Sequence, residues 1–161
     1  DDVIAAFDLD GKINSKGWIQ AYDSIFHKQP SQIAERLNAM KIIAEKNLAS
    51  ASKDISGPGI IGTVAMLCES SKVGAEINLE SIPRPANVKL KDWLITYPSI
   101  GFILTSSKAD SCIKIFKEHK LRAARIGKII KDKKIRLKHR KESAIFIDLN
   151  KESIFGKRKT L

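Results

Sequence analysis

The segment that most constrains the fold is KDISGPGIIGT, residues 53–63, because it combines three glycines and a proline with an apolar run. Proline is favoured at the first position of a helix, so Pro58 predicts that a helix begins there. The apolar residues at 60–68 predict that this helix is buried over a broad side. Gly74 is a favoured residue after a helix, and the helix is expected to end near it.

The rest of the chain alternates between strand and helix patterns. Strands are expected at residues 3–9, 75–79, 100–105, 123–130, 134–137 and 144–149. Helices are expected at residues 31–49 with Ser31 as N-cap, at 90–97, and after Ser107, which can form a capping box with Asp110. Because the last strands are hairpin-like, we predict an α+β fold with a mixed, largely antiparallel sheet and helices packed on it in α/β/α layers.

Positive charge is concentrated in the last third of the chain. Residues 1–107 contain 11 Lys or Arg and 12 Asp or Glu, whereas residues 108–161 contain 18 and 6, which gives the net charge of +11. Such a patch attracts nucleic acid, nucleotides or an acidic partner. A basic nucleic-acid-binding module at 108–161 is therefore an alternative function. We expect Phe116, Phe146 and Phe155 to lie in the core instead of stacking on bases, which weighs against it.

Neither a membrane span nor secretion is indicated. The chain has no apolar run long enough to cross a bilayer, and its acidic start does not resemble a signal peptide. Cys68 and Cys112 form no C-x-x-C and are expected to be buried, so a cytoplasmic protein is predicted. We expect one domain over residues 1–161, with residues 1–10 as a junction strand to a missing N-terminal domain and residues 156–161 as a tail.

The glycines also fit the dinucleotide pattern G-x-G-x-x-G, but the context does not. That fingerprint needs an apolar strand before the first glycine, and ASASKDIS is small and polar. Pro58 also removes a backbone N–H. Gly57 and Gly59 still precede a helix, whose first N–H groups favour an anion. Asp54 could hold a metal ion or a substrate hydroxyl, and Ser56 could cap the helix or contact a ligand.

A second motif, FDLDGKINS at residues 7–15, follows the first strand. It resembles the nucleophile motif of haloacid-dehalogenase-type phosphatases, in which the first Asp attacks phosphorus and the second transfers a proton. Asp8 and Asp10 would take these roles. Lys12 stands where that family has Thr, and no late acidic pair follows. The phosphatase therefore remains a further alternative, and no metal is assigned.

The segment KDISGPGIIGTVAMLCESSKVGAEINLESIP, residues 53–83, resembles the glycine-rich part of the C-terminal domain of the AIR synthase (aminoimidazole ribonucleotide synthetase)-related superfamily. Its members include selenophosphate synthetase, thiamine monophosphate kinase and a hydrogenase maturation factor. The later pieces YPSIGFILTS and LRAARIGKI also fit, and the resemblance spans roughly residues 1–150. DISGPG and the early FDLDG look most similar to archaeal AIR-synthase-related proteins of the methanogenesis marker 2 type.

The resemblance implies that the chain is the C-terminal domain of an ATP-dependent enzyme of phosphoryl-transfer or ligase type. In such enzymes the N-terminal domain forms the dimer and holds Mg-ATP, and the C-terminal domain covers the cleft. ATP and magnesium are therefore expected mainly at the missing N-terminal domain, and this chain alone requires neither and should be inactive. The implied partners are that domain, a second copy and a small-molecule substrate.

The resemblance carries over four positions as phosphate or substrate contacts: Asp54, Ser56, Gly57 and Gly59. Kinase-like members have an acidic residue at the position of Gly57, so no metal role is expected there. Asp8 and Asp10 would lie near the junction with the N-terminal domain, in an interdomain role or as possible metal ligands.

Overall fold

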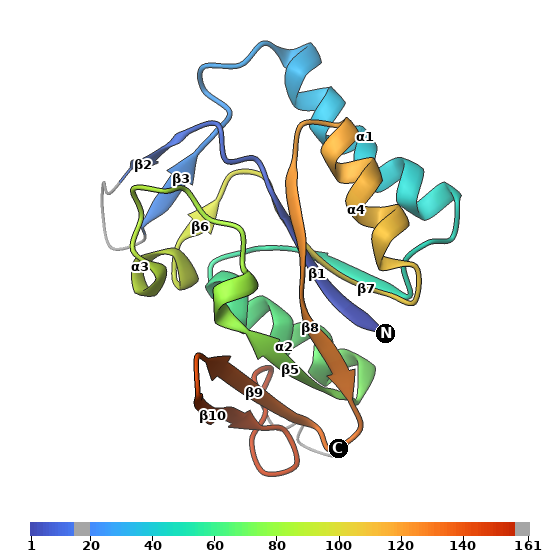
Figure 1. Cartoon of the computed structure of the whole chain (residues 1–161), viewed down its shortest axis with the longest axis vertical. Helices are drawn as coiled ribbons and strands as arrows, with labels where there is room; N and C mark the ends of the chain where they lie inside the picture. Colours follow the sequence, from blue (N-terminus) through green and yellow to red (C-terminus); the bar gives the residue numbers. More distant parts are fainter. Residues whose placement is uncertain (15–19, 157–161) are drawn as a thin grey trace.

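The computed structural model describes residues 1–14 and 20–156, and in this part of the chain one large sheet organises the fold (Figure 1). It has seven strands, in the spatial order β10 (Glu142–Asp148), β9 (Lys134–His139), β5 (Gly74–Asn78), β8 (Arg122–Ile130), β1 (Asp2–Phe7), β7 (Gly101–Ser106) and β4 (Ala51–Asp54). All neighbours are antiparallel except β5 and β9, which run parallel. A small second sheet contains β2 (Lys12–Asn14), β3 (Ala21–Asp23) and β6 (Tyr97–Pro98).

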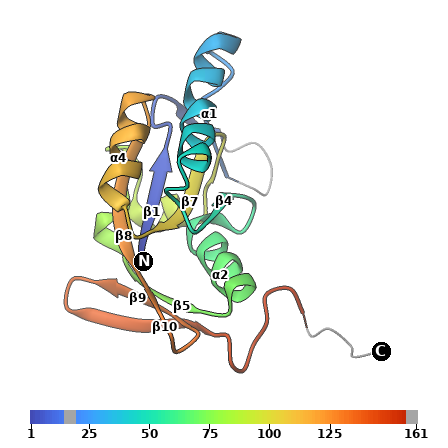
Figure 2. The same ribbon diagram turned by 90° about the vertical axis from the view of Figure 1, so that its right-hand side faces the viewer.

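Helices cover both faces of the large sheet (Figure 2). Helices α1 (Pro30–Glu45) and α4 (Ala109–Glu118) pack on one face; α2 (Gly59–Ser71), the short α3 (Leu90–Leu94) and the 3₁₀ turn η1 (Leu79–Ser81) belong to the other side. Strand β1 is buried on both faces: Val3, Ala5 and Phe7 join the core under α2, and Ile4 and Ala6 join the core under α1 and α4. The predicted α+β architecture is confirmed.

Strand β4 was not expected from the sequence. Its residues ASKD alternate between half-buried and exposed, because β4 is an edge strand paired only with β7. Edge strands accept polar residues that would be excluded from a central strand. The glycine-rich turn therefore does follow a strand, although not the buried parallel strand that a dinucleotide fingerprint requires.

Helix α1 begins one residue earlier than expected. Pro30 takes the first helical position and Gln29 is the N-cap, so the prediction of Ser31 as N-cap is wrong. The backbone N–H of Gln29 donates to Oε1 of Gln32 at 2.8 Å, so a side chain from the first turn of the helix pairs with the N-cap backbone.

The predicted capping box of α4 is also wrong. The N–H of Lys108, the N-cap, donates to Oγ of Ser106 at 2.8 Å, one residue before the expected Ser107. Asp110 turns away from the helix start and forms an ion pair with Arg125 at 3.1 Å.

Helix α2 ends before Gly74. Its last residue is Ser71, and Lys72 takes the left-handed conformation with φ of 57°. Gly74 instead begins β5, where a Cβ would lie 2.5 Å from backbone atoms of Lys134. The glycine is needed for close approach of two strands and not for ending the helix.

The late aromatic residues differ in their burial. Phe116 is buried as expected, but Phe146 and Phe155 are 52% and 60% exposed, so the prediction that all three lie in the core is wrong for these two. Cys68 and Cys112 are both buried and free, as predicted. None of the helices within residues 1–14 and 20–156 is long and apolar enough to cross a membrane. The predicted tail lies mostly outside the described residues.

Candidate functional site

Two sequence motifs meet at one end of the large sheet. Strands β1 and β4 run parallel to each other with β7 between them, so both finish where β7 begins. The N–H of Asp8, after β1, donates to the carbonyl of Ile100 at 3.1 Å, and the N–H of Ile55, after β4, donates to the carbonyl of Gly101 at 2.9 Å. We call this end of the sheet, where β1 and β4 finish and β7 begins, the site end.

The turn between β4 and α2, residues 55–59, has two glycines with different environments. The N–H of Gly59 donates to the carbonyl of Ser56 at 2.9 Å and so closes the turn. Gly59 has φ of +73°, and a Cβ there would lie 2.5 Å from the carbonyl oxygen of Leu94 in α3. Gly57 is exposed, and nothing lies within 4 Å of the position its Cβ would take. Gly59 is therefore required for the conformation of the turn. Gly57 has no side chain to cover the turn, which stays accessible to solvent.

The polar groups around Gly57 are accessible. Asp54 is exposed and its carboxylate lies 3.5 Å from Nζ of Lys53. Ser56 is half-buried, and its N–H points to Oγ1 of Thr63 at 3.4 Å. Among the described residues, the N–H of Gly57 has no hydrogen-bond partner. An N–H at the start of a buried helix, next to a half-buried serine, is suited to an anionic oxygen.

Asp8 lies across the start of β7 from this turn and is only 1% exposed. Its Oδ1 accepts from the N–H of Asp10 at 3.0 Å, and its Oδ2 accepts from Nε of Arg36 at 3.2 Å. Nζ of Lys28 is 3.3 Å from the same Oδ2 and also donates to the carbonyl of Ser24 at 2.8 Å. Two cations thus compensate one buried carboxylate, and the cluster ties β1 to α1.

Asp10 differs from Asp8 in being open to solvent. Its Oδ2 lies 3.1 Å from Nζ of Lys28 and 3.5 Å from Nε2 of His27. The hydrogen bond from Lys28 lowers the pKa of Asp10, and the nearby His27 acts in the same direction. Among the described residues there is no group of three or more His, Cys, Asp or Glu side chains that could hold a metal ion. The metal role of Asp8 and Asp10 stays a prediction.

The cluster also bears on the phosphatase alternative. A nucleophilic aspartate must present an oxygen to the phosphorus of its substrate. Both oxygens of Asp8 are directed to Arg36, Lys28 and the backbone of Asp10. This geometry favours a role in fixing the segment after β1.

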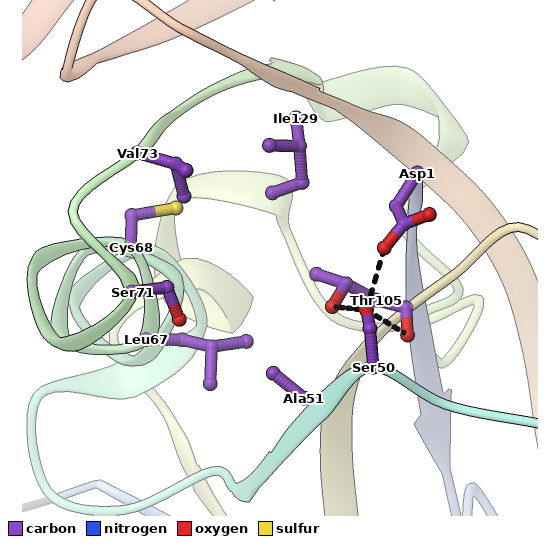
Figure 3. Close-up of a pocket in the computed structure, with 9 residues that line it drawn as sticks. All are labelled: Asp1, Ser50, Ala51, Leu67, Cys68, Ser71, Val73, Thr105 and Ile129. Carbon is purple, nitrogen blue, oxygen red and sulfur yellow. Dashed lines mark hydrogen bonds between the residues drawn. The ribbon is translucent and has the colours of Figure 1, made fainter. Parts of the chain in front are cut away.

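A separate cavity of about 200 Å³ lies at the opposite end of the sheet (Figure 3). There Oγ of Ser50 forms hydrogen bonds with Oγ1 of Thr105 at 2.7 Å and with the carboxylate of Asp1 at 2.5 Å. Cys68 also lines this cavity, and burial raises the pKa of its thiol to about 12. A thiol with such a pKa stays protonated near neutral pH and is a poor nucleophile, so Cys68 is not an activated group in this cavity.

Sequence reasoning missed three residues that shape the site end: Lys28, Arg36 and Leu94. Arg36 occupies a buried position of α1, where a charged residue signals a buried partner. Lys28 and Leu94 carry no comparable signal, because their contacts come from segments distant in the sequence.

Known proteins are similar to this chain over most of its length. A family model described as "AIR synthase related protein, C-terminal domain" matches residues 9–140. An uncharacterized protein of Methanocaldococcus jannaschii is 34% identical over 158 residues, which cover 97% of this chain and 48% of the relative. An uncharacterized protein of Synechocystis is 32% identical over 137 residues, covering 84% of this chain and 42% of the relative. The chain therefore spans about half the length, or less, of these relatives.

Solved structures show the same fold. Phosphoribosylformylglycinamidine synthase II from Thermotoga maritima superimposes with a TM-score of 0.74 at 16% identity, over 92% of this chain and 25% of that protein. The hydrogenase maturation protein HypE in complex with ATP superimposes with a TM-score of 0.64 at 11% identity, over 91% of this chain and 50% of HypE. At sequence identities this low, the structural similarity shows a shared fold alone.

Proposed function

The chain belongs to the family of AIR synthase related proteins, matching its C-terminal domain, and from this membership we propose that it works as one half of an ATP-dependent enzyme. In this proposal the chain covers the active-site cleft, and an N-terminal domain holds Mg-ATP. The reaction class is transfer of a phosphoryl group to an oxygen, with or without later displacement by a nucleophile. Similar folds occur in T. maritima PurL complexed with ATP and in HypE in complex with ATP.

The observation that carries the proposal is the open turn at Gly57. The free N–H of Gly57 and the hydroxyl of Ser56 would contact a phosphate oxygen, because backbone N–H groups at a helix start suit negative charge. The carboxylate of Asp54 would accept a hydrogen bond from a substrate hydroxyl, or would add a ligand to a metal ion held by the N-terminal domain. Gly59 acts indirectly by setting the turn against α3. Catalysis of this kind depends on positioning and charge stabilisation around phosphates.

Exposed apolar side chains beside the turn support contact with another domain. Ile95 is 66% exposed and Tyr97 is 40% exposed. The Cα of Ile95 lies 3.1 Å from the position a Cβ would take on Gly59. Apolar groups gathered next to polar site residues often mark an interaction surface. We propose that the N-terminal domain covers this surface, and that Asp10 faces the same junction.

Thermal unfolding of the chain with Mg-ATP, ADP or inorganic phosphate tests this function. A ligand near its Kd would stabilise the chain by about 0.4 kcal/mol and raise the Tm by roughly 1–2 °C. Ser56→Ala should reduce that increase, and the control Ser52→Ala, on an exposed position of β4, should keep it. The chain alone should not hydrolyse ATP. Measurable hydrolysis, or an equal loss in the Ser52→Ala control, would overturn the proposal.

Exposure of Phe146 favours one other function, binding of nucleic acid by the basic strands. Phe146 is 52% exposed on β10, next to β9 with Lys134, Arg136 and Lys138. Exposed aromatic and basic side chains together can stack on bases and neutralise phosphates. Filter binding at two salt concentrations tests this function. Steeply salt-dependent binding that Phe146→Ala weakens supports it, and no binding at low salt removes it.

A further inference from the structure

A pocket of about 390 Å³ opens at the site end, on the other side of β1 from the glycine turn. It lies between the end of β1, the start of β8, the last turn of α4 and the loop after η1. Its floor is apolar and includes Leu9, Ile82 and Ala123. The pocket includes neither Asp8 nor Asp10 and no residue of the glycine turn.

Three cations surround the pocket: Arg84, Lys117 and Arg122. None of them takes part in an ion pair with a carboxylate of residues 1–14 or 20–156. Glu80 is the acidic residue in the lining, and its Oε2 accepts from the N–H of Arg140 at 3.1 Å. The lining therefore carries three cations and one carboxylate, and Glu80 forms no ion pair with any of the three cations.

Hydrogen bonds hold the walls of this pocket in place. Nη1 of Arg84 donates to the carbonyl of Val88 at 2.6 Å, which directs one side of the guanidinium and leaves its other donors free. Nε1 of Trp93 donates to the carbonyl of Pro83 at 2.9 Å. The hydroxyl of Tyr22 donates to the carbonyl of Leu9 at 2.7 Å.

The same aromatic cluster supports the glycine turn. The ring of Trp93 lies 5.2 Å from the rings of Phe7 and Tyr22, and the next residue in α3, Leu94, contacts Gly59. Helix α3 thus fixes both the pocket and the turn, which lie at one end of the sheet.

We propose that this pocket binds the phosphate group of an organic phosphate, with Arg84, Lys117 and Arg122 around the phosphate and the apolar floor under the organic part. Guanidinium groups match phosphate oxygens in charge and geometry. An apolar floor selects a phosphate that carries a carbon skeleton over the free ion. This site goes beyond the proposed function, because it is separate from the glycine turn.

Titration of the ¹⁵N-labelled chain with phenyl phosphate and with inorganic phosphate tests the site. We expect the amide signals of Arg122, Ala123 and Ala124 to shift, and phenyl phosphate to bind more tightly than inorganic phosphate. Arg122→Gln and Lys117→Gln should each weaken phenyl phosphate about two- to fivefold, since the cations are exposed. Lys114→Gln, one turn earlier on α4, is the matched control and should have no effect.

Two further results test whether the pocket is a binding site separate from the glycine turn. Ser56→Ala should leave phenyl phosphate binding at this pocket unchanged, so failure of the glycine turn and failure of the pocket are distinguishable. Shifts that do not include residues 122–124, or an equal loss of affinity in Lys114→Gln, would overturn the proposal.

Discussion

At the scale of single residues, the two aspartates after β1 have opposite environments. Asp8 is buried between Lys28 and Arg36, whereas the side chain of Asp10 is 74% exposed. Asp8→Ala removes the one buried carboxylate from Lys28 and Arg36, which keep only the more exposed Asp10 and Glu35, and should lower the free energy of unfolding by up to about 3–5 kcal/mol. Asp10→Asn removes a solvent-screened pair and should cost about 1 kcal/mol or less. Urea unfolding measures both, and equal losses would contradict the assignment of Asp8 as a structural anion.

The two glycines of the turn should also respond differently. Gly59→Ala meets positive φ and the carbonyl of Leu94, and should cost about 1–3 kcal/mol. Gly57→Ala meets open space and should change stability by no more than about 0.5 kcal/mol. Denaturant unfolding of the two variants checks this order. A costly Gly57→Ala would show that Gly57 is a packing residue.

Burial of Cys68 predicts its reactivity. Because the pKa of its thiol is raised to about 12, the native state favours the protonated form. That contribution to stability is present below the pKa of the unfolded thiol, and is lost as pH rises toward the folded value. Iodoacetamide at pH 8 should therefore modify Cys68, identified by peptide mass, only when denaturant is added. Rapid modification of the native chain would contradict this.

At the scale of elements, α3 supports the whole site end. Its Trp93 is 1% exposed, contacts Phe7 and Tyr22, and binds the carbonyl of Pro83. Trp93→Ala should cost about 3–5 kcal/mol. A milder change, Trp93→Phe, removes the N–H and should shift the amide signals of both Gly59 and Arg84. Shifts at only one of these two would show that α3 does not couple the turn with the pocket.

Two buried elements are among those that the sequence predicts well. Residues 60–68 are almost continuously apolar and residues 75–79 alternate apolar and polar side chains, and α2 and β5 lie close to the expected places. Strand β4 was missed because its pairing depends on β7, fifty residues further on, and not on its own composition. The N-caps Gln29 and Lys108 differ from the expected Ser31 and Ser107 by one or two residues, because neighbouring polar residues compete locally for the same N–H groups.

The candidate site, too, is only partly predictable from the sequence. Asp54, Ser56, Gly57 and Gly59 could be selected from sequence because a glycine-rich helix start has a local pattern. Their nearness to Asp8 and Asp10 depends on the strand order, which no local pattern contains. The partners Lys28 and Arg36 come from the loop before α1 and from α1 itself, and only the folded chain brings them to Asp8.

At the scale of the whole molecule, polar and charged groups are divided between two regions. The site end combines an open glycine turn, an exposed aspartate and exposed apolar residues beside α3. The basic strands β8, β9 and β10 lie toward the other edge of the sheet. This division agrees with a domain that meets its partner domain and a phosphate ligand at one end, while its charged edge remains solvated.

The amide signal of Gly57 reports directly on whether the glycine turn contacts phosphate. In a titration of the ¹⁵N-labelled chain with Mg-ATP, we expect a saturable shift of Gly57 and its neighbours in residues 54–59, and loss of that shift in Ser56→Ala. Weak affinity is expected, since Mg-ATP is proposed to be held mainly by another domain. If the signal of Gly57 stays unchanged while ATP shifts signals elsewhere in the chain, the glycine turn does not contact phosphate and the proposed function is wrong.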